Sequence, residues 1–317
     1  MTVCQDAARR AHFLLGIAYV SIRAYQVGMT QNSTIPFLKM NGLGNDFVVI
    51  DNRVPGQGLA DLNDRMIRAI ADRDGGIGCD QLIILEHSDS ADIFMRIFNA
   101  QGGEVDACGN ATRCIGFLMQ TQTGRPTSTI ETNAGLLGAA VQPSGDVSVD
   151  MGKPRFGWQD IPLAEEFHDT SHIELQVGPI DAPVLHSPCV VNVGNPHCIF
   201  WVEDLDAHDL RQVGPFLENH IMFPERANIT LARIDSDREI TIRVWERGAG
   251  LTKACGTAAC ATIVCAVRRN LTARSARVNL PGGSLQMEWR ESDSHILMTG
   301  ASELEYAGEF DLKDFAG

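Results

Sequence analysis

The chain reads CGNAT at residues 108–112 and CGTAA at residues 255–259, so that the two cysteines stand 147 residues apart. Nine residues before each cysteine a strand-like run ends on a polar residue, Asn99 in the first case and Glu246 in the second. After each cysteine come an apolar helix pattern, a strand, a tight turn containing glycine, and two more strands. This order of landmarks predicts a duplicated unit of about 150 residues, a typical domain size.

The stretches 109–121 and 256–269 predict the helix of each copy. Both are apolar nearly all round, which is typical of a helix buried on most sides. Most of the remaining chain reads as strands of five to seven residues separated by turn residues, so each helix should lie inside a curled sheet. The prediction is an α+β fold of two pseudo-symmetric, β-rich, barrel-like domains, each wrapped around one central buried helix. A third helix is predicted over 62–72.

Residues 1–34 do not share the repeat. The apolar run 13–20 follows two arginines and faintly resembles a signal peptide, but it is short and no small-residue cleavage site follows. Met29 offers an alternative start. We expect residues 1–34 to be an extension outside the core, the first domain to cover 35–152, and the second domain to cover 153–299.

Composition excludes several classes of protein. With 317 residues, 44% hydrophobic and 21% charged, the chain is an ordinary soluble protein with enough length for two cores. A formal charge of -14 argues against nucleic acid as a partner, and no apolar run approaches 18 residues, which argues against a membrane span. Nine cysteines without regular spacing indicate a reducing cytoplasm rather than a secreted disulfide framework.

Cys108 and Cys255 should lie at the N-termini of the two buried helices. Unpaired backbone N–H groups and the helix dipole stabilise an anion there, and such positions can lower a thiol pKa from ~8.5 to roughly 3.5–7.5. The same N–H groups could hold a substrate carboxylate. Two cysteines set identically in two halves predict one acid and one base that face a common centre. They should titrate jointly, as one thiolate and one thiol.

A metal site is not expected. Zinc ligands converge at short Cys-x2-4-Cys spacing, whereas Cys114 and Cys260 follow the two helix-terminal cysteines by six and five residues and point elsewhere around their helices. The other cysteines have the simpler interpretation of small buried apolar residues. This applies to Cys79, Cys189, Cys198 and Cys265.

Several polar residues recur near equivalent positions. Asn99 and Glu246 end strands on their apolar faces, where a polar group needs a partner, although the strands could simply meet solvent there. Asn45 and Asn195 lie in turns, 63 and 60 residues before their cysteines, and such asparagines are often structural. His197 could be a core histidine. Arg247, beside Glu246, could be a surface charge or a carboxylate clamp.

At these residues the chain resembles the diaminopimelate epimerase family over about residues 35–310. The matching phrases are 39–47 (KMNGLGNDF), 72–81 (DRDGGIGCDQ), 98–100 (FNA), 108–114 (CGNATRC), 131–135 (ETNAG), 194–197 (GNPH), 224–228 (PERAN), 246–248 (ERG) and 254–257 (ACGT). The resemblance implies a diaminopimelate-epimerase-like fold whose last strand, 300–314, returns to the first domain near Pro154. It also implies a cofactor-independent homodimer that interconverts LL- and meso-2,6-diaminopimelate for lysine and peptidoglycan-precursor synthesis.

The resemblance further implies the site residues. Cys108 and Cys255 would be the acid–base pair, and His197 and Glu246 would orient the reacting amino group. The implied substrate-binding residues are Asn45, Gln81, Asn99, Gly109, Asn110, Asn195, Asn228, Glu246, Arg247, Gly256 and Thr257. Two departures are visible: Ala111 and Ala258 stand where many members carry glycine, and alanine is the better helix former.

Three alternatives remain open from the sequence. A related two-cysteine racemase acting on proline or hydroxyproline would lack a clamp for a second head group. A non-catalytic ligand-binding or redox-sensing protein would use the two cysteines only to form a disulfide. A pyridoxal-phosphate enzyme is disfavoured, because the chain has four lysines and only Lys253 lies beside a cysteine.

Overall fold

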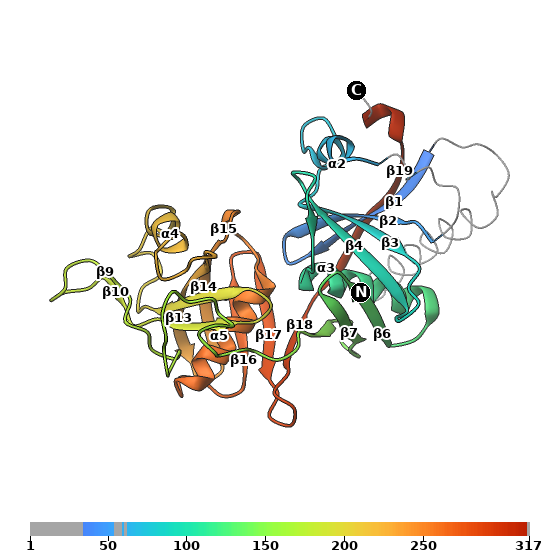
Figure 1. Cartoon of the computed structure of the whole chain (residues 1–317). Coiled ribbons are helices and arrows are strands. Elements are labelled where there is room, and N and C mark those ends of the chain that lie inside the picture. Colours follow the sequence, from blue (N-terminus) through green and yellow to red (C-terminus); the bar gives the residue numbers. More distant parts are fainter. Residues whose placement is uncertain (1–33, 54–58, 60–61, 316–317) are drawn as a thin grey trace, which may run out of the picture. The chain divides into compact units, whose positions relative to one another are not determined.

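The computed structural model describes residues 34–53, 59 and 62–315, so the predicted extension lies, except for its last residue, outside the described residues. The chain divides into two compact units, residues 1–147 with 301–317 and residues 148–300 (Figure 1). The C-terminal strand β19 (Glu303–Asp311) pairs antiparallel with β1 (Thr34–Gly42). The first unit is therefore built from two separate pieces of chain.

The first unit contains one sheet. Its strands are β1, β2 (Asn45–Asp51), β3 (Gln81–Glu86), β4 (Ile93–Asn99), β5 (Glu104–Val105), β6 (Thr127–Thr132), β7 (Gly135–Val141) and β19. The ladders run β1–β2 antiparallel, β2–β3 parallel, β3–β4 antiparallel, β4–β5 antiparallel, β4–β6 parallel and β6–β7 antiparallel. Its helices are α2 (Asp64–Ala71), α3 (Gly109–Thr123) and the 3-10 turn η2 (Leu312–Phe315).

The second unit repeats this series of ladders. β11 (Cys189–Asn192) and β12 (Pro196–Trp201) are antiparallel, β12 and β13 (Asn228–Ser236) parallel, and β13 and β14 (Glu239–Glu246) antiparallel. β14 then pairs antiparallel with β15 (Gly250–Thr252) and parallel with β16 (Ser275–Leu280), and β17 (Gly283–Trp289) pairs antiparallel with β16 and with β18 (Ile296–Gly300). Its other elements are β8 (Val147–Asp150), β9 (Gln176–Val177), β10 (Leu185–His186), α4 (Leu210–Glu218) and α5 (Gly256–Arg268).

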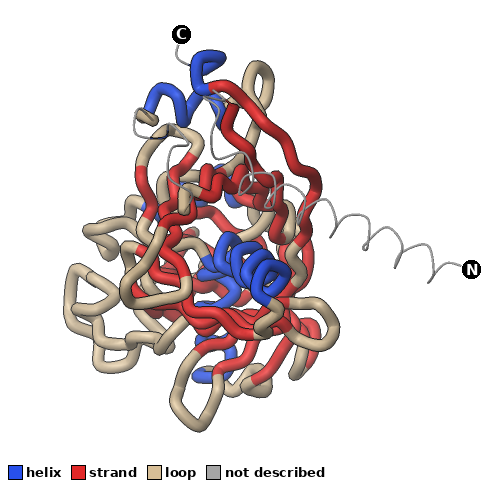
Figure 2. Tube along the Cα trace, turned by 90° about the vertical axis from the view of Figure 1, so that its right-hand side faces the viewer, coloured by secondary structure: helices blue, strands red, loops and turns tan. Residues whose placement is uncertain are grey.

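Each sheet encloses one helix. α3 packs against β1, β6 and β7, and α5 packs against β11, β12, β13, β16, β17 and β18. All residues from 109 to 116 of α3 and from 258 to 266 of α5 are buried. In Figure 2 helical turns lie inside a ring of strands. These contacts confirm the predicted architecture of two pseudo-symmetric, β-rich units, each around a buried helix.

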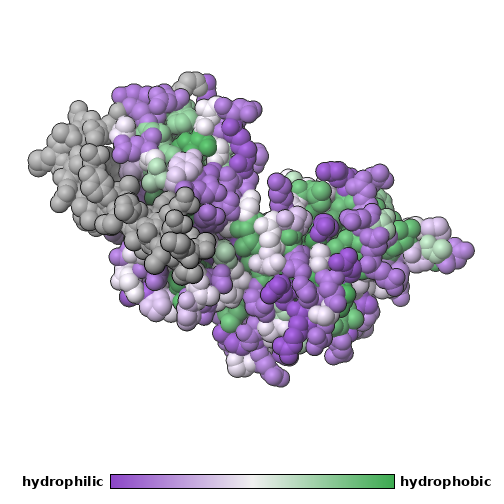
Figure 3. Space-filling model, turned by 180° about the vertical axis from the view of Figure 1, so that it is seen from behind, coloured by the Kyte–Doolittle hydropathy of each residue, from purple (hydrophilic) through white to green (hydrophobic). Residues whose placement is uncertain are grey.

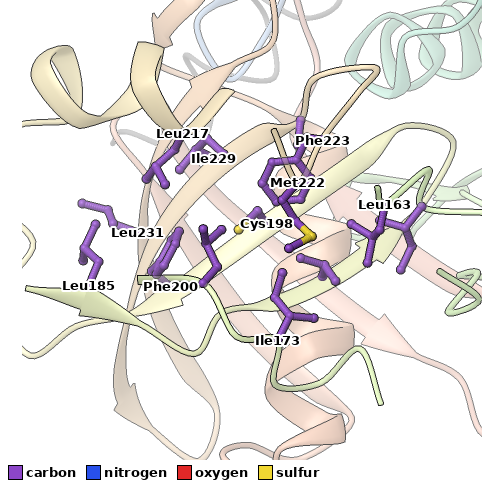
Figure 4. Close-up of a cluster of buried hydrophobic side chains, with 14 of the residues drawn as sticks. Leu163, Ile173, Leu185, Cys198, Phe200, Leu217, Met222, Phe223, Ile229 and Leu231 are labelled. Carbon is purple, nitrogen blue, oxygen red and sulfur yellow. The ribbon is translucent and has the colours of Figure 1, made fainter. Parts of the chain in front are cut away.

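Helix α4 is absent from the sequence-based prediction. Gly214 and Pro215 lie inside it, and both residues read as helix breakers. The helix forms because Asp209 caps it by accepting the backbone N–H of Arg211, and because Leu210 and Leu217 are buried. They join the apolar cluster of Figure 4, in which Leu217 lies beside Ile229 of β13. Tertiary burial thus outweighs the weak local propensity.

The helices of the described part of the chain include none that is long and apolar enough to cross a membrane. In the second unit, the face drawn in Figure 3 carries hydrophilic side chains interspersed with apolar ones.

Candidate active site

The two helix-terminal cysteines have nearly the same backbone geometry. Cys108 is the N-cap of α3 with φ −146° and ψ 111°, and Cys255 is the N-cap of α5 with φ −136° and ψ 104°. Neither side chain caps its own helix. Both thiols therefore stand beside the first N–H groups of a buried helix, as the sequence predicts.

In the first unit, two asparagine side chains lie near Cys108, which is partly exposed. Its Sγ lies 3.9 Å from Oδ1 of Asn45, and the same Oδ1 accepts a hydrogen bond from Nδ2 of Asn110 at 3.3 Å. Asn110 is buried at the start of α3, where its Oδ1 accepts from the guanidinium of Arg113 at 2.9 Å. Two of the predicted binding residues thus contact each other, and one of them, Asn45, also contacts the first cysteine.

An ionic network holds the start of β2, which carries Asn45. Nδ2 of Asn45 donates to Asp80 at 2.9 Å, and Asp80 also accepts a hydrogen bond from the Arg73 guanidinium at 2.7 Å. Asp46 binds Lys39 at 2.6 Å and Arg73 at 2.8 Å. Burial raises the pKa of Asp46, but the hydrogen bonds from Arg73 and Lys39 outweigh burial, and its net pKa is well below the ordinary value.

Gln81 and Asn99 lie opposite each other where β3 begins and β4 ends. Oδ1 of Asn99 accepts the backbone N–H groups of Gln101 and Gly103 at 2.9 and 3.0 Å, so this side chain shapes the turn after β4. Oε1 of Gln81 is buried and has no hydrogen-bond partner within the described residues. A buried amide oxygen without a partner is an acceptor suited to a ligand donor.

In the second unit, Cys255 is buried, with 5% of its surface exposed. Burial raises the pKa of its thiol well above the ordinary value, and the carboxylate of Glu246 raises it further, although Thr257 lowers it. Oγ1 of Thr257 lies 3.5 Å from Sγ. The expectation of a lowered thiol pKa is therefore wrong for Cys255, because desolvation and a neighbouring anion outweigh the helix N-terminus.

His197, on β12, is fully buried beside Asn195. Its Nε2 lies 2.8 Å from Oδ1 of Asn195, while its buried Nδ1 has no partner among the described residues. Burial, followed by the charge of Arg247, lowers the pKa of His197 to about 3. The imidazole is thus neutral at physiological pH. An Nε2–H donor to Asn195 leaves Nδ1 as an acceptor.

Asn228 ties the turn after β14 to the neighbouring strands. Its Nδ2 donates to the carbonyl of Pro196 at 2.9 Å, and its Oδ1 accepts the backbone N–H of Arg247 at 2.9 Å. The Arg247 guanidinium donates to the carbonyl of Glu225 at 2.9 Å. Oε1 of Glu246 accepts from Oγ1 of Thr252. All three of these predicted binding residues therefore have structural contacts as well.

The repeat extends to the site. Gln81 lies beside Phe47 in the β2–β3 ladder, and Asn228 lies beside His197 in the β12–β13 ladder. Asn228 and Glu246 each follow their counterparts Gln81 and Asn99 by 147 residues, the same interval that separates the cysteines. The duplication thus gathers the candidate residues at the same end of each sheet.

Each unit carries its own share of the predicted site. The first unit holds Asn45, Gln81, Asn99, Cys108, Gly109 and Asn110, and the second holds Asn195, His197, Asn228, Glu246, Arg247, Cys255, Gly256 and Thr257. Residues 34–53, 59 and 62–315 contain no group of three or more His, Cys, Asp and Glu side chains arranged to hold a metal ion.

Three supporting residues were not predicted from the sequence. Asp80 and Arg113 contact the asparagines around Cys108. Glu218, buried at the end of α4, accepts the backbone N–H of Gly248 at 2.9 Å and the indole N–H of Trp245 at 2.7 Å, and so fixes the turn that follows Glu246. Asp80 and Arg113 lie inside the motifs 72–81 and 108–114, which gave a usable signal, whereas Glu218 has no local signal.

Comparison with known proteins gives one consistent family. The sequence model described as diaminopimelate epimerase matches residues 37–157 and 189–305. A protein of Afipia carboxidovorans named diaminopimelate epimerase is 54% identical over 291 residues, which covers 91% of this chain and 99% of that protein. One of Chelativorans sp. with the same name is 54% identical over 279 residues, covering 87% and 93%.

Solved structures share the fold at low sequence identity. A hydroxyproline epimerase from Agrobacterium vitis superposes with a TM-score of 0.61 at 15% identity, covering 88% of this chain and 91% of that one. A phenazine biosynthesis protein of the PhzF family from Bacillus anthracis superposes with a TM-score of 0.60 at 19% identity, covering 87% and 99%. These structures match the two-unit, β-rich architecture alone.

Proposed function

The chain belongs to the diaminopimelate epimerase family of isomerases, and we propose that it interconverts LL- and meso-2,6-diaminopimelate through Cys108 and Cys255. The observation that supports this proposal most directly is the pair of cysteines at equivalent helix N-termini, one in each unit. Inversion of a stereocentre by proton exchange needs a base on one face of Cα and an acid on the other. A duplicated fold supplies such a pair of groups.

In this mechanism the two thiols begin in different protonation states. The buried Cys255, beside Glu246, is the protonated thiol of the resting enzyme. Cys108 is then the thiolate that removes the α-proton, and Cys255 delivers its proton from the opposite face. In the reverse direction the two roles exchange. Because two neighbouring thiols do not both ionise cheaply, the pair carries one negative charge in either direction.

The planar carbanion needs stabilisation that does not depend on a cofactor. The first N–H groups of α3 and α5, at Gly109, Asn110, Gly256 and Thr257, can bind the carboxylate at the reacting centre. The carboxylate of Glu246 can bind the reacting ammonium group, and Nδ1 of the neutral His197 can accept a further N–H. Exclusion of water strengthens these interactions in the transition state.

Selection of diaminopimelate over shorter amino acids requires contacts with its second amino-acid head group. The amides of Asn45, Gln81, Asn99, Asn195 and Asn228, with the guanidinium of Arg247, are the groups assigned to it. The unpaired Oε1 of Gln81 can accept from an ammonium group, and Arg247 can donate to a carboxylate. A substrate that lacks the second head group leaves these groups unpaired and is rejected.

Chiral analysis of the products tests the function. The purified chain is incubated with LL-diaminopimelate, and the stereoisomers are separated over time. The expected result is an approach to a mixture of LL and meso forms without added cofactor. Proline and hydroxyproline, incubated in parallel, should remain unchanged. Racemisation of either one with no change in diaminopimelate would overturn the proposal.

Cellular location and assembly belong to the same proposal. The eight described cysteines form no disulfide bond, which supports a reducing cytoplasm. Lysine biosynthesis is the pathway of this family of enzymes. A homodimer is the assembly that the family resemblance suggests, and light scattering of the purified chain should give twice the mass of 34.5 kDa.

A further inference from the structure

A row of hydrogen bonds beside Cys108 links a positively charged side chain to a negatively charged one. Arg113 donates to Oδ1 of Asn110 at 2.9 Å, Nδ2 of Asn110 donates to Oδ1 of Asn45 at 3.3 Å, and Nδ2 of Asn45 donates to Asp80 at 2.9 Å. A guanidinium thus lies at one end and a carboxylate at the other. We call these four side chains the amide row.

The charges fix the direction of both amides. A guanidinium can only donate hydrogen bonds and an ionised carboxylate can only accept them. Asn110 must therefore turn its oxygen to Arg113, and Asn45 must turn its NH2 group to Asp80. Turning either amide over would place donor against donor, or oxygen against oxygen. Polarisation along the row makes Oδ1 of Asn45 a stronger acceptor than an isolated amide oxygen.

The thiol of Cys108 lies beside that oxygen. Its Sγ is 3.9 Å from Oδ1 of Asn45. A thiol can donate a hydrogen bond to an amide oxygen, whereas a thiolate has no hydrogen to donate and is repelled by it. The orientation of Asn45 thus decides whether an acceptor or a donor faces the sulfur.

Asp80 is held in place by groups other than Asn45. One of its oxygens binds Arg73 at 2.7 Å, and the other also accepts the backbone N–H of Asp46 at 3.1 Å. Arg73 is shared with the Asp46 carboxylate. The carboxylate therefore has a fixed position from which it can orient Asn45.

The second unit lacks the amide row. At 147 residues after Asp80, Asn110 and Arg113 stand Ala227, Thr257 and Cys260, none of which carries a charge. Both units nevertheless build the same ladders around the same buried helix. The row is thus not a requirement of the fold, and it makes the surroundings of Cys108 unlike those of Cys255.

We propose that Asp80 is a positioning residue that turns Oδ1 of Asn45 toward Sγ of Cys108, with Arg113 setting the same direction in Asn110. The proposal rests on the function above, because it assumes that the proton on this sulfur is the one exchanged with substrate. The row orients the S–H bond whenever Cys108 carries its proton, and it limits the fraction of thiolate, the form that removes the α-proton, that is available at a given pH.

Within the part of the chain that the structure describes, other ionisable groups on the neighbouring elements do not hydrogen-bond to the Asn45 side chain. These groups are Lys39, Asp46, Arg73, Asp106, Cys114 and Glu305. Lys39, Asp46 and Arg73 form one network. None of them donates to or accepts from the Asn45 side chain in the hydrogen bonds of the described residues. The effect of a substitution at Asp80 on Cys108 therefore reports on the amide row.

The test measures the reactivity of Cys108 itself. Wild type and D80N are treated with short pulses of iodoacetamide from pH 5 to 10, and modification of Cys108 is followed by peptide mass spectrometry. In D80N the Asn45 amide can turn over and offer NH2 to the sulfur, which stabilises the thiolate. The pH midpoint of Cys108 modification should fall by about half to one pH unit. This corresponds to a roughly 3- to 10-fold larger fraction of thiolate at pH values below the midpoint.

A double-mutant cycle separates positioning from a direct effect of charge. In an N45A background, D80N should cause no further shift, because Asp80 acts through Asn45. A shift of the same size in that background would overturn the proposal, as would an unchanged or raised midpoint in D80N. D92N is the matched control, since Asp92 carries the same charge but precedes β4, about 20 Å along the strand from Asn99.

Two further measurements keep the outcomes distinct. If D80N does not fold, as judged by circular dichroism, D80S removes the carboxylate without adding volume and should shift the midpoint in the same direction. Alkylation does not require substrate, so an unmoved midpoint contradicts the positioning role even in an active enzyme. Absence of epimerisation in the wild type would contradict the proposed function and leave the alkylation result standing.

Discussion

At the scale of single residues, the two cysteines share a backbone position but differ in their surroundings. Cys108 is partly exposed and lies beside amide groups, whereas Cys255 is buried next to a carboxylate. Burial raises the pKa of the Cys255 thiol, so this residue carries its proton at neutral pH. In the proposed mechanism this difference makes Cys255 the thiol and Cys108 the thiolate of the resting pair.

Replacement of either cysteine by serine should nearly abolish epimerisation. A hydroxyl is far less acidic than a thiol. C108S therefore lacks the base, and C255S lacks the acid for this direction and the base for the reverse direction. We expect losses of about 10²- to 10⁴-fold in kcat, the usual contribution of one positioned acid–base group. The rates are measured by chiral chromatography in both directions.

C265S is the matched control for these variants, because Cys265 is buried in α5, three helical turns from the N-cap, and has no assigned role. It should keep wild-type activity if it folds. Full activity of either C108S or C255S would exclude the two-base mechanism.

His197 should remain neutral throughout the physiological range. Burial and the neighbouring Arg247 lower its pKa to about 3, so protonation should not begin above pH 5. Nitrogen-15 NMR of the imidazole, assigned by comparison with H197Q, should show one proton-bearing and one bare nitrogen from pH 5 to 8. Titration with a midpoint near 6.5 would show that the site is hydrated and that Nδ1 is not a permanent acceptor.

At the scale of elements, the buried helix needs close contact with its sheet. Gly116 lies on the face of α3 that meets β7, and a Cβ added there would lie 2.7 Å from Cβ of Ala139 and 3.2 Å from Val147. Both neighbours are themselves buried. Glycine is therefore required at this position by packing rather than by backbone conformation.

G116A should destabilise the first unit. The added methyl group overpacks the contact between α3 and β7, at a cost of about 1–3 kcal/mol in the free energy of unfolding. G138A is the control, because a Cβ at Gly138 of β7 meets no atom within 4 Å. Urea unfolding followed by circular dichroism should give a lower midpoint for G116A only. Equal midpoints for the two variants would contradict the close packing.

The elements also show what the sequence could predict. The central helices and the paired strands were predictable because their apolar patterns are long and repeated. Helix α4 was missed because Pro215 interrupts it and its stability comes from burial of Leu217 against β13. The same contact places Glu218 beneath the turn after Glu246, which no local pattern could indicate.

At the scale of the whole molecule, the duplication conserves the ladders and the cysteines but not the ionic network. The pairing of Lys39, Asp46, Arg73 and Asp80 exists only in the first unit. The residues 147 and 150 positions after Asp46 are Val193 and Pro196, and those after Asp80 are Ala227 and Thr230, so the counterparts of both carboxylates are uncharged. The repeat was predictable from spacing. The differences between its copies depend on side-chain partners that spacing does not give.

This network should make the protein sensitive to acid. Burial raises the pKa of Asp46, but Arg73 and Lys39 lower it more, so its folded pKa is below the unfolded value of about 3.9. The stabilisation is present above that value and is lost as the pH falls through the folded pKa. The wild type should lose stability to urea between pH 5 and 3, and D46N should lose less over the same interval. D74N, at an exposed site, is the control and should behave as wild type.

The central claim is that two different groups act on opposite faces of one carbon, and isotope exchange in D2O tests it most directly. LL-diaminopimelate is incubated with the enzyme in D2O, and both isomers are isolated at low conversion for mass spectrometry. The thiol that protonates the carbanion has exchanged with solvent, so the meso product should carry one deuterium at the inverted Cα while the recovered LL substrate carries almost none. Product that keeps its original hydrogen, or substrate labelled as fast as product, would contradict the account.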